Sequence, residues 1–141
     1  MISVIGAGPA GSRAAQLLAE AGKEVQVFEE HGTVGEPVAC TGIITGILEA
    51  ELELPKSLIV NVPEKARIYA PNGSYAEVKL KNDVILDRAG LDQFLAQQAQ
   101  KAGARYHLHH RYRSHEANGN IVMNIENKKN NSSSEVETDI L

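Results

Sequence analysis

Three glycines and two carboxylates near the start of the chain have the spacing of a dinucleotide-binding site. Gly6, Gly8 and Gly11 form a G-x-G-x-x-G sequence, and Glu29 follows 18 residues after the third glycine. A glycine at position 8 removes the Cβ that would block a pyrophosphate, and a carboxylate at position 29 can accept hydrogen bonds from both ribose hydroxyls. The next residue is Glu30 and not an arginine. The spacing therefore predicts an adenine dinucleotide site and disfavours NADP, whose 2′-phosphate a carboxylate repels.

Regular elements are predicted on both sides of these residues, where they would hold the glycines and the carboxylate in place. The β-branched run at 1–5 and the alternating residues at 24–28 predict two strands, and Pro9 and Gly22 mark the start and end of a helix between them. The N-terminus of that helix favours a phosphate through its N–H groups and its dipole. A glycine-rich turn in an unrelated α/β domain is the alternative, and the complete order of strand, turn, helix, strand and acid argues against it. The apolar helix face is predicted to contain Ala14, Ala15, Leu17, Leu18 and Ala21, and the candidate nucleotide-binding residues are Gly6, Gly8, Pro9, Ala10, Gly11, Glu29 and Glu30.

The composition is that of a soluble globular protein of one-domain length. The chain has 141 residues and a formal net charge of −4 with no basic block, which argues against nucleic acid as a partner. No apolar run approaches the roughly 18 residues of a membrane-spanning helix, and the single cysteine, Cys40, excludes an internal disulfide. A cytoplasmic protein is the simplest interpretation, and peripheral contact with a membrane surface is left open.

The loop after Glu29 carries a second motif, Val34-Gly35-x-Pro37-Val38-x-Cys40, with Gly42 shortly after it. Together with Gly8-Pro9-Ala10-Gly11 and Glu29, this motif resembles the geranylgeranyl reductase family of FAD-dependent reductases, which includes archaeal enzymes that saturate digeranylgeranylglycerophospholipids. The resemblance implies FAD as the cofactor, with Cys40, Thr41 and Gly42 beside the flavin. It places Cys40, the candidate catalytic residue, near the reacting face without making it a nucleophile. A buried, inert cysteine is the alternative that the sequence alone favours.

The middle of the chain predicts an excursion from the nucleotide-binding part. Residues 43–54 are expected to form a short helix, and the alternating segments 65–70 and 74–80 flank Pro71-Asn72-Gly73, which predicts a β-hairpin. In the resembled family such strands join the substrate-covering domain, whose sheet forms one wall of a cavity for an isoprenoid chain. The alternative is that the hairpin only covers the hydrophobic core. We therefore expect one FAD-binding domain at 1–141, with an excursion at 55–82 toward the substrate domain.

A third motif, Asp87-Arg88 followed by a helix at 89–102, resembles the same family and the wider group of aromatic hydroxylase-like flavoproteins. The resemblance implies that Arg88 reaches the FAD, a role that suits a guanidinium because its fixed fork can hold pyrophosphate oxygens. A solvated surface arginine is the alternative.

The last part of the chain predicts a third parallel strand at 104–109 and a β-meander. The resemblance implies that the backbone near Tyr112 contacts the adenine. Segments 120–126 and 134–141 predict strands joined by a polar turn. The end on Ile140-Leu141 is typical of the middle of a strand, so a truncated chain is expected, about the first third of a family member. A metal site at His107, His109, His110 and His115 is disfavoured because no cysteine or carboxylate cluster completes it, and solvated edge histidines are expected.

These observations predict an α/β fold, a Rossmann-type FAD-binding unit with a parallel sheet, an inserted β-hairpin and a C-terminal β-meander. The resemblance implies the N-terminal part of a flavoprotein oxidoreductase that reduces isoprenoid double bonds in lipid biosynthesis, with FAD and an isoprenoid or lipid substrate as partners and an unidentified electron donor. An FAD-dependent monooxygenase of the same fold and a non-catalytic nucleotide-binding fragment are the alternatives. No residue is a convincing general acid.

Overall fold

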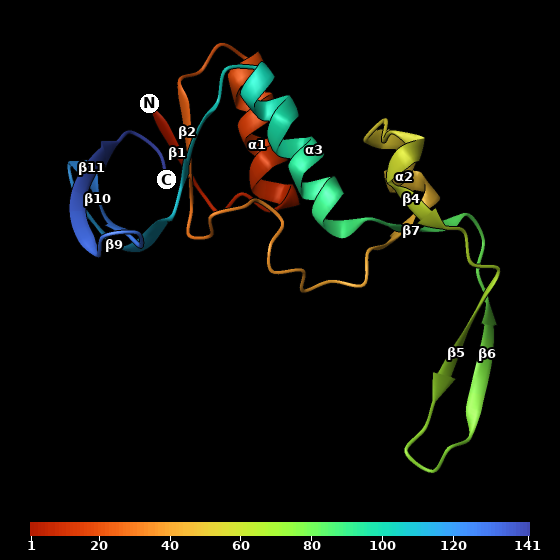
Figure 1. Ribbon diagram of the computed structural model, residues 1–141. Coiled ribbons are helices and arrows are strands. Elements are labelled where there is room, and N and C mark those ends of the chain that lie inside the picture. Colours follow the sequence, from red (N-terminus) through yellow and green to blue (C-terminus); the bar gives the residue numbers. More distant parts are fainter. The chain divides into compact units, whose positions relative to one another are not determined.

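The computed structural model describes the backbone of residues 1–141 and all side chains except those at positions 49, 50 and 118. Its contacts divide the chain into two compact units (Figure 1). The first comprises Met1–Val38 and Leu91–Leu141, and the second comprises Ala39–Gly90. The expected excursion at 55–82 lies wholly inside the second unit, which begins earlier, at residue 39.

A three-stranded parallel sheet forms the centre of the first unit. Its strands are β1 (Ile2–Ile5), β2 (Val25–Glu29) and β8 (Arg105–Leu108), in the order β1-β2-β8. The register aligns Ile2 with Val25 and Gln26 with Arg105. On the free side of β1, Ile140 pairs in parallel with Ile2 and accepts the N–H of Ser3 at 2.9 Å. The expected third strand is confirmed, although it ends at Leu108.

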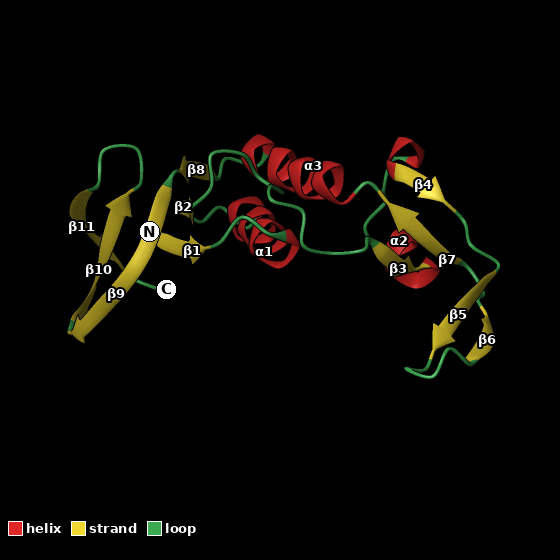
Figure 2. Cartoon of the chain, turned by 60° about the horizontal axis from the view of Figure 1, so that its bottom comes forward, coloured by secondary structure: helices red, strands yellow, loops and turns green.

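The parallel sheet is covered on both faces, so the middle strand β2 is buried along nearly its whole length. Helices α1 (Pro9–Glu20) and α3 (Arg88–Lys101) cover one face, as Figures 1 and 2 show. The antiparallel sheet of β9 (His110–Asn118), β10 (Asn120–Asn127) and β11 (Ser132–Thr138) covers the other face. Because side chains alternate along a strand, Val25 and Val27 of β2 pack in the core on the helical face, and Phe28 packs with Met123 and Ile125 of β10.

The predicted β-meander is confirmed, with one strand more than expected. Strands β10 and β11 pair from Ile121 with Thr138 to Asn127 with Ser132, and β9 pairs with the other edge of β10. The sequence did not predict β9, whose polar residues lack a clear alternation. The helix expected at 89–102 is confirmed as α3.

The second unit contains a small antiparallel sheet and a hairpin. Its elements are β3 (Ile43–Thr45), α2 (Gly46–Glu51), a 3₁₀ turn η1 (Lys56–Leu58), β4 (Ile59–Asn61), β5 (Lys65–Tyr69), β6 (Tyr75–Lys79) and β7 (Asp83–Leu86). The predicted hairpin is confirmed, since β5 and β6 pair from Lys65 with Lys79 to Tyr69 with Tyr75 (Figure 2). The prediction of a helix from residue 43 is wrong at its start: residues 43–45 are β-branched and form β3, whose backbone pairs with β7.

The predicted fold class is therefore confirmed. The prediction of which residues form the buried apolar face of α1 is only partly right. In α1 the buried positions include Ser12 and Ala15, whereas Ala14, Leu17 and Ala21 of the expected apolar face are exposed. Those three residues lie on the neighbouring stripe of the helix, beyond the contact with the sheet. Within the described part of the chain, no helix is long and apolar enough to cross a membrane.

Candidate functional site

The glycine turn between β1 and α1 has the geometry that its sequence requires. Gly6 has a φ of +93°, which favours glycine, and its N–H donates to the Phe28 carbonyl at 2.8 Å. A Cβ on Gly11 would lie 2.1 Å from the Gly6 carbonyl oxygen and 3.3 Å from Val4 Cγ1, so only glycine allows this helix to approach the strand. A Cβ on Gly8 would meet no protein atom within 4 Å. The turn therefore presents open space at Gly8, in front of the N-terminus of α1.

The N-terminus of α1 leaves N–H groups available for an anion. Pro9 is the first helical residue, and Gly8 supplies no capping side chain. The Ser12 N–H donates to the Gly8 carbonyl at 2.9 Å, whereas the N–H groups of Ala10 and Gly11 precede the first intrahelical hydrogen bond. Such groups, together with the helix dipole, favour a phosphate.

A buried serine anchors this turn from behind. The Ser12 hydroxyl donates to the Ala7 carbonyl at 3.1 Å and accepts the Tyr106 hydroxyl of β8 at 2.9 Å. Burial raises the pKa of Tyr106 above its ordinary value, so the phenol stays protonated and keeps donating. The turn is thus held to the third strand of the sheet, a contact that the sequence did not predict.

Glu29, at the end of β2, is attached directly to the glycine turn. Its Oε2 accepts the Ala7 N–H at 2.8 Å, and its Oε1 accepts the His31 N–H at 2.9 Å and lies 2.6 Å from His31 Nδ1. Burial alone would raise the pKa of Glu29, but the two N–H groups and the imidazole outweigh it and lower that pKa below its ordinary value. Glu29 is therefore a carboxylate at neutral pH, fixed beside the turn.

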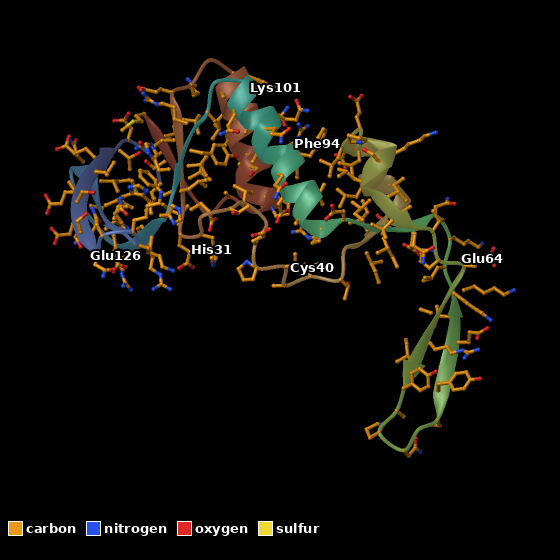
Figure 3. The ribbon with its side chains drawn as sticks, viewed as in Figure 1. His31, Cys40, Glu64, Phe94, Lys101 and Glu126 are labelled. Atoms are coloured by element: carbon orange, nitrogen blue, oxygen red, sulfur yellow. The ribbon has the colours of Figure 1, made fainter. Side chains whose placement is uncertain are left out.

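A pocket of about 280 Å³ opens at this end of the sheet, close to the lower limit for small-molecule sites. Figure 3 labels His31, which follows the end of β2 at the pocket wall. The pocket brings together four predicted site residues, Gly6, Glu29, Glu30 and Tyr112. Its lining residues are Ile5, Gly6, Phe28, Glu29, Glu30, His31, His110, Arg111 and Tyr112.

Two cations from distant parts of the chain pair with Glu30. Its Oε2 lies 2.8 Å from Arg111 Nε and 3.3 Å from Lys128 Nζ. Partial burial opposes ionisation, but the hydrogen bond from Lys128 and the charges of Arg111 and Lys128 lower the pKa of Glu30. The sequence argument against NADP used both acidic residues, Glu29 and the Glu30 that follows it. Since two cations lie beside Glu30, that argument now depends on Glu29 alone.

Two of the four histidines considered as metal ligands, His107 and His110, pack against aromatic rings. The His107 ring lies 4.9 Å from the Phe28 ring in a stacked geometry and 5.8 Å from the His110 ring, edge to face. The prediction of a solvated edge histidine is therefore wrong for His107, whose Nε2 is buried without a hydrogen-bond partner. His109 lies outside β8, with a φ of +61°, so it does not share a strand face with His107. No group of three or more potential metal ligands occurs among the described residues.

The other predicted site residues lie in the second unit. Cys40, labelled in Figure 3, is exposed, so the part of the alternative that placed it in the protein interior is wrong. Thr41 is also exposed. Gly42 has a φ of +76°, and a Cβ there would lie 2.5 Å from the Leu86 carbonyl oxygen, so the local fold requires a glycine. The predicted place of Cys40, Thr41 and Gly42 beside a flavin stays a prediction.

Arg88 stands at the start of α3, where its neighbour has a structural role. The Asp87 carboxylate accepts the Gly90 N–H at 3.0 Å and so caps the helix. Asp87 therefore caps the helix. The contact of Arg88 with FAD stays a prediction.

The chain is similar to proteins of known name over these same residues. Residues 4–41 match a family model described as an NAD(P)-binding Rossmann-like domain. Over 111 residues the chain is 38% identical to a digeranylgeranylglycerophospholipid reductase from Methanosarcina acetivorans, a match that covers 73% of this chain and 27% of that enzyme. The crystal structure of a geranylgeranyl bacteriochlorophyll reductase-like protein from Thermoplasma acidophilum superimposes with a TM-score of 0.79 at 30% identity, covering 97% of this chain and 36% of that one.

The same fold occurs in a flavin-dependent monooxygenase solved with FAD and substrate, with a TM-score of 0.71 at 15% identity, covering 99% of this chain and 29% of that one. The chain thus spans from 27% to 36% of the length of these three proteins. The resemblance to the geranylgeranyl reductase family that the motifs predict is confirmed.

Proposed function

We propose, from this resemblance and from the geometry of the glycine turn, that the chain is the N-terminal FAD-binding part of a flavoprotein oxidoreductase that reduces isoprenoid double bonds in a lipid. A lipid substrate is supported by the name of the similar reductase from Methanosarcina acetivorans. A cytoplasmic protein with peripheral membrane contact fits such a substrate, because a lipid is reached at a membrane surface.

The observation that carries the nucleotide site is the contact between Glu29 and the glycine turn. Glu29 Oε2 accepts the Ala7 N–H at 2.8 Å, so the carboxylate lies within one hydrogen bond of the turn that would hold a pyrophosphate. The open space at Gly8 provides the complementary feature, because a phosphate would occupy the volume that a side chain would fill. Ribose and pyrophosphate are adjacent groups in an adenine dinucleotide, so one ligand can reach both.

Different residues would bind different groups of the FAD. Gly6, Gly8 and the first turn of α1, with Pro9, Ala10 and Gly11, would hold the pyrophosphate through backbone N–H groups. Glu29 would accept the ribose hydroxyls, with Glu30 beside it and Tyr112 in the wall near the adenine. Bound FAD would supply the hydride chemistry, to which the protein adds orientation and a dry environment. Cys40, Thr41 and Gly42 would lie beside the flavin, and Arg88 near its phosphates or other polar groups.

Titration of the 141-residue protein with FAD tests this function. Flavin fluorescence and absorbance should change in a saturable manner, and Glu29→Ala should weaken binding by about 1–3 kcal/mol because the ribose loses a charged acceptor. Glu24→Ala is the matched control: Glu24 immediately precedes β2, is exposed and pairs with Arg105, away from the pocket. Unchanged FAD affinity in Glu29→Ala, or no FAD binding by the wild-type chain, contradicts the proposal.

A further inference from the structure

One carboxylate oxygen of Glu30 lies between two cations beside the pocket. Glu30 Oε2 is 2.8 Å from Arg111 Nε and 3.3 Å from Lys128 Nζ. Arg111 belongs to β9 and Lys128 to the turn after β10, so neither comes from the loop that follows β2. Their side chains are 41% and 38% exposed, which leaves both within reach of a ligand. A ligand oxygen in the position of Glu30 Oε2 would therefore contact both cations at once.

The two cations also have donors to spare. The contact with Glu30 uses Arg111 Nε, and in the part of the chain that the structure describes no group accepts a hydrogen bond from the Nη atoms of Arg111. A guanidinium fork and an ammonium group are common partners of phosphate oxygens. Arg111 and Lys128 thus have the chemistry of a phosphate site, and a carboxylate occupies its centre.

The position of this pair beside Glu29 indicates which phosphate it would meet. Glu29, Glu30 and Arg111 line the same pocket. The proposed function assigns the ribose hydroxyls to Glu29, so a phosphate on the 2′ oxygen would lie next to Glu29, where Glu30 and its two cations are. A dinucleotide without that phosphate, such as FAD or NAD, does not need the pair.

We propose that Arg111 and Lys128 form a subsite for the 2′-phosphate of an adenine dinucleotide, and that Glu30 closes this subsite. The proposal rests on the proposed function, because it concerns the same adenosine site. While Glu30 is present, the two cations are balanced by the carboxylates of Glu29 and Glu30. A 2′-phosphate brings a further charge of roughly −1.5 to −2 near neutral pH, which the closed subsite cannot balance. Glu30 is thus a specificity-determining residue, and it acts by holding the cations.

The experiment compares NADH with NADPH, which differ only in the 2′-phosphate and are both fluorescent. Each is titrated into the wild-type chain, Glu30→Gln and Glu30→Ala, and FAD is titrated in parallel. The Gln variant keeps the shape of the side chain, and the Ala variant also removes the acceptor. Glu77→Gln is the matched control, because Glu77 pairs with Lys65 and Arg67 in the hairpin of the second unit and does not line the pocket.

Two double variants separate the subsite from the net charge. Glu30→Gln with Arg111→Gln restores the wild-type net charge and removes one cation of the subsite. Glu30→Gln with Arg113→Gln restores the same net charge and keeps both cations, because Arg113 pairs with Glu126 at 2.6 Å and not with Glu30. The proposal requires that these two double variants differ, whereas an effect of net charge alone makes them equal.

The wild-type chain and Glu77→Gln should bind NADH more tightly than NADPH. Glu30→Gln and Glu30→Ala should shift the affinity ratio toward NADPH by about tenfold, because the phosphate gains two charged partners that are partly exposed. Adding Arg111→Gln should abolish this shift, and adding Arg113→Gln should retain it. FAD affinity should change little in the Glu30 variants, since FAD has no 2′-phosphate.

Three results overturn the proposal. They are an unchanged ratio in Glu30→Ala, an equal shift in Glu77→Gln, and equal ratios in the two double variants. Failure of Glu30→Ala to bind NADPH overturns the proposal as well, whatever the result with FAD. If the wild-type chain binds NADH but not FAD, the proposed FAD-binding function is wrong and the subsite is still judged by the ratio of NADH to NADPH affinity.

Discussion

Replacement of Gly8 by alanine separates ligand binding from stability more cleanly than any other change at the glycine turn. Gly8 has extended backbone angles, φ −68° and ψ −178°, which alanine adopts without strain. The added methyl group would meet no protein atom within 4 Å. It would, however, occupy the space in which we place the pyrophosphate. The variant should therefore fold normally and bind FAD poorly.

The magnitudes follow from these contacts. Alanine is a poorer N-cap than glycine, but it lowers the entropy of the unfolded chain, so the free energy of unfolding should change by less than about 1 kcal/mol. A methyl group prevents close approach of phosphate oxygens to the backbone N–H groups. We expect FAD affinity to fall at least about tenfold, which corresponds to roughly 1.4 kcal/mol.

Gly11→Ala, in contrast to Gly8→Ala, should lower the stability of the fold. Its Cβ would lie 2.1 Å from the backbone oxygen of Gly6, and a backbone atom cannot rotate away. Forcing α1 away from β1 should cost about 1–3 kcal/mol of stability, as overpacking does elsewhere. Urea denaturation and FAD titration of both variants give the two measurements. If Gly8→Ala binds FAD as tightly as the wild type, the phosphate does not lie at Gly8 and the assignment is wrong.

Two further predictions concern other parts of the structure. Burial, His110 and Arg105 lower the pKa of His107, so the unfolded chain binds a proton more readily. The contribution of neutral His107 to the free energy of unfolding should thus be fully present above about pH 6.5, and it should decline as the pH falls toward the lower pKa of the folded state. His107→Phe should flatten this decline in denaturant midpoints, and an unchanged decline would assign it to other groups. Asp87→Ala should lower the free energy of unfolding by about 1 kcal/mol, because the Gly90 N–H loses its capping acceptor. Asp87→Asn should retain most of this stability, because its side-chain oxygen can still accept the N–H. Equal losses of stability in the Ala and Asn variants would contradict the capping role of Asp87.

Local sequence predicted most of the nucleotide-binding half of the fold. The strand, glycine turn, helix and second strand at 2–29 occur within a few residues of the expected bounds. The same holds for the hairpin around Pro71-Asn72-Gly73 and for helix α3. Each of these patterns depends on backbone preferences or on periodicity within one segment, which is the information that a short stretch of sequence contains.

The errors occurred where pairing between segments decided the outcome. Residues 43–45 were expected to be helical, and they form a strand because β7 offers a partner. Strand β9 was not predicted, since its residues gain their pattern only from the bulged pairing with β10. For Cys40, the alternative of a buried side chain, which sequence alone favoured, is wrong because the side chain is exposed. Burial and strand pairing are properties of the assembled chain, so single-segment patterns cannot specify them.

The sequence alone determined the turn that favours a phosphate and the acid that follows it, because both depend on the spacing of a few residues along one βαβ segment. Only the tertiary structure decided what surrounds that acid. Arg111 and Lys128 reach Glu30 from 81 and 98 residues away in the chain, and His107 meets Phe28 across neighbouring strands. Even the short contact between His31 and Glu29 depends on how the chain turns at the end of β2. Electrostatics and packing act through space, so the chemistry of the site is set by residues that sequence spacing does not connect.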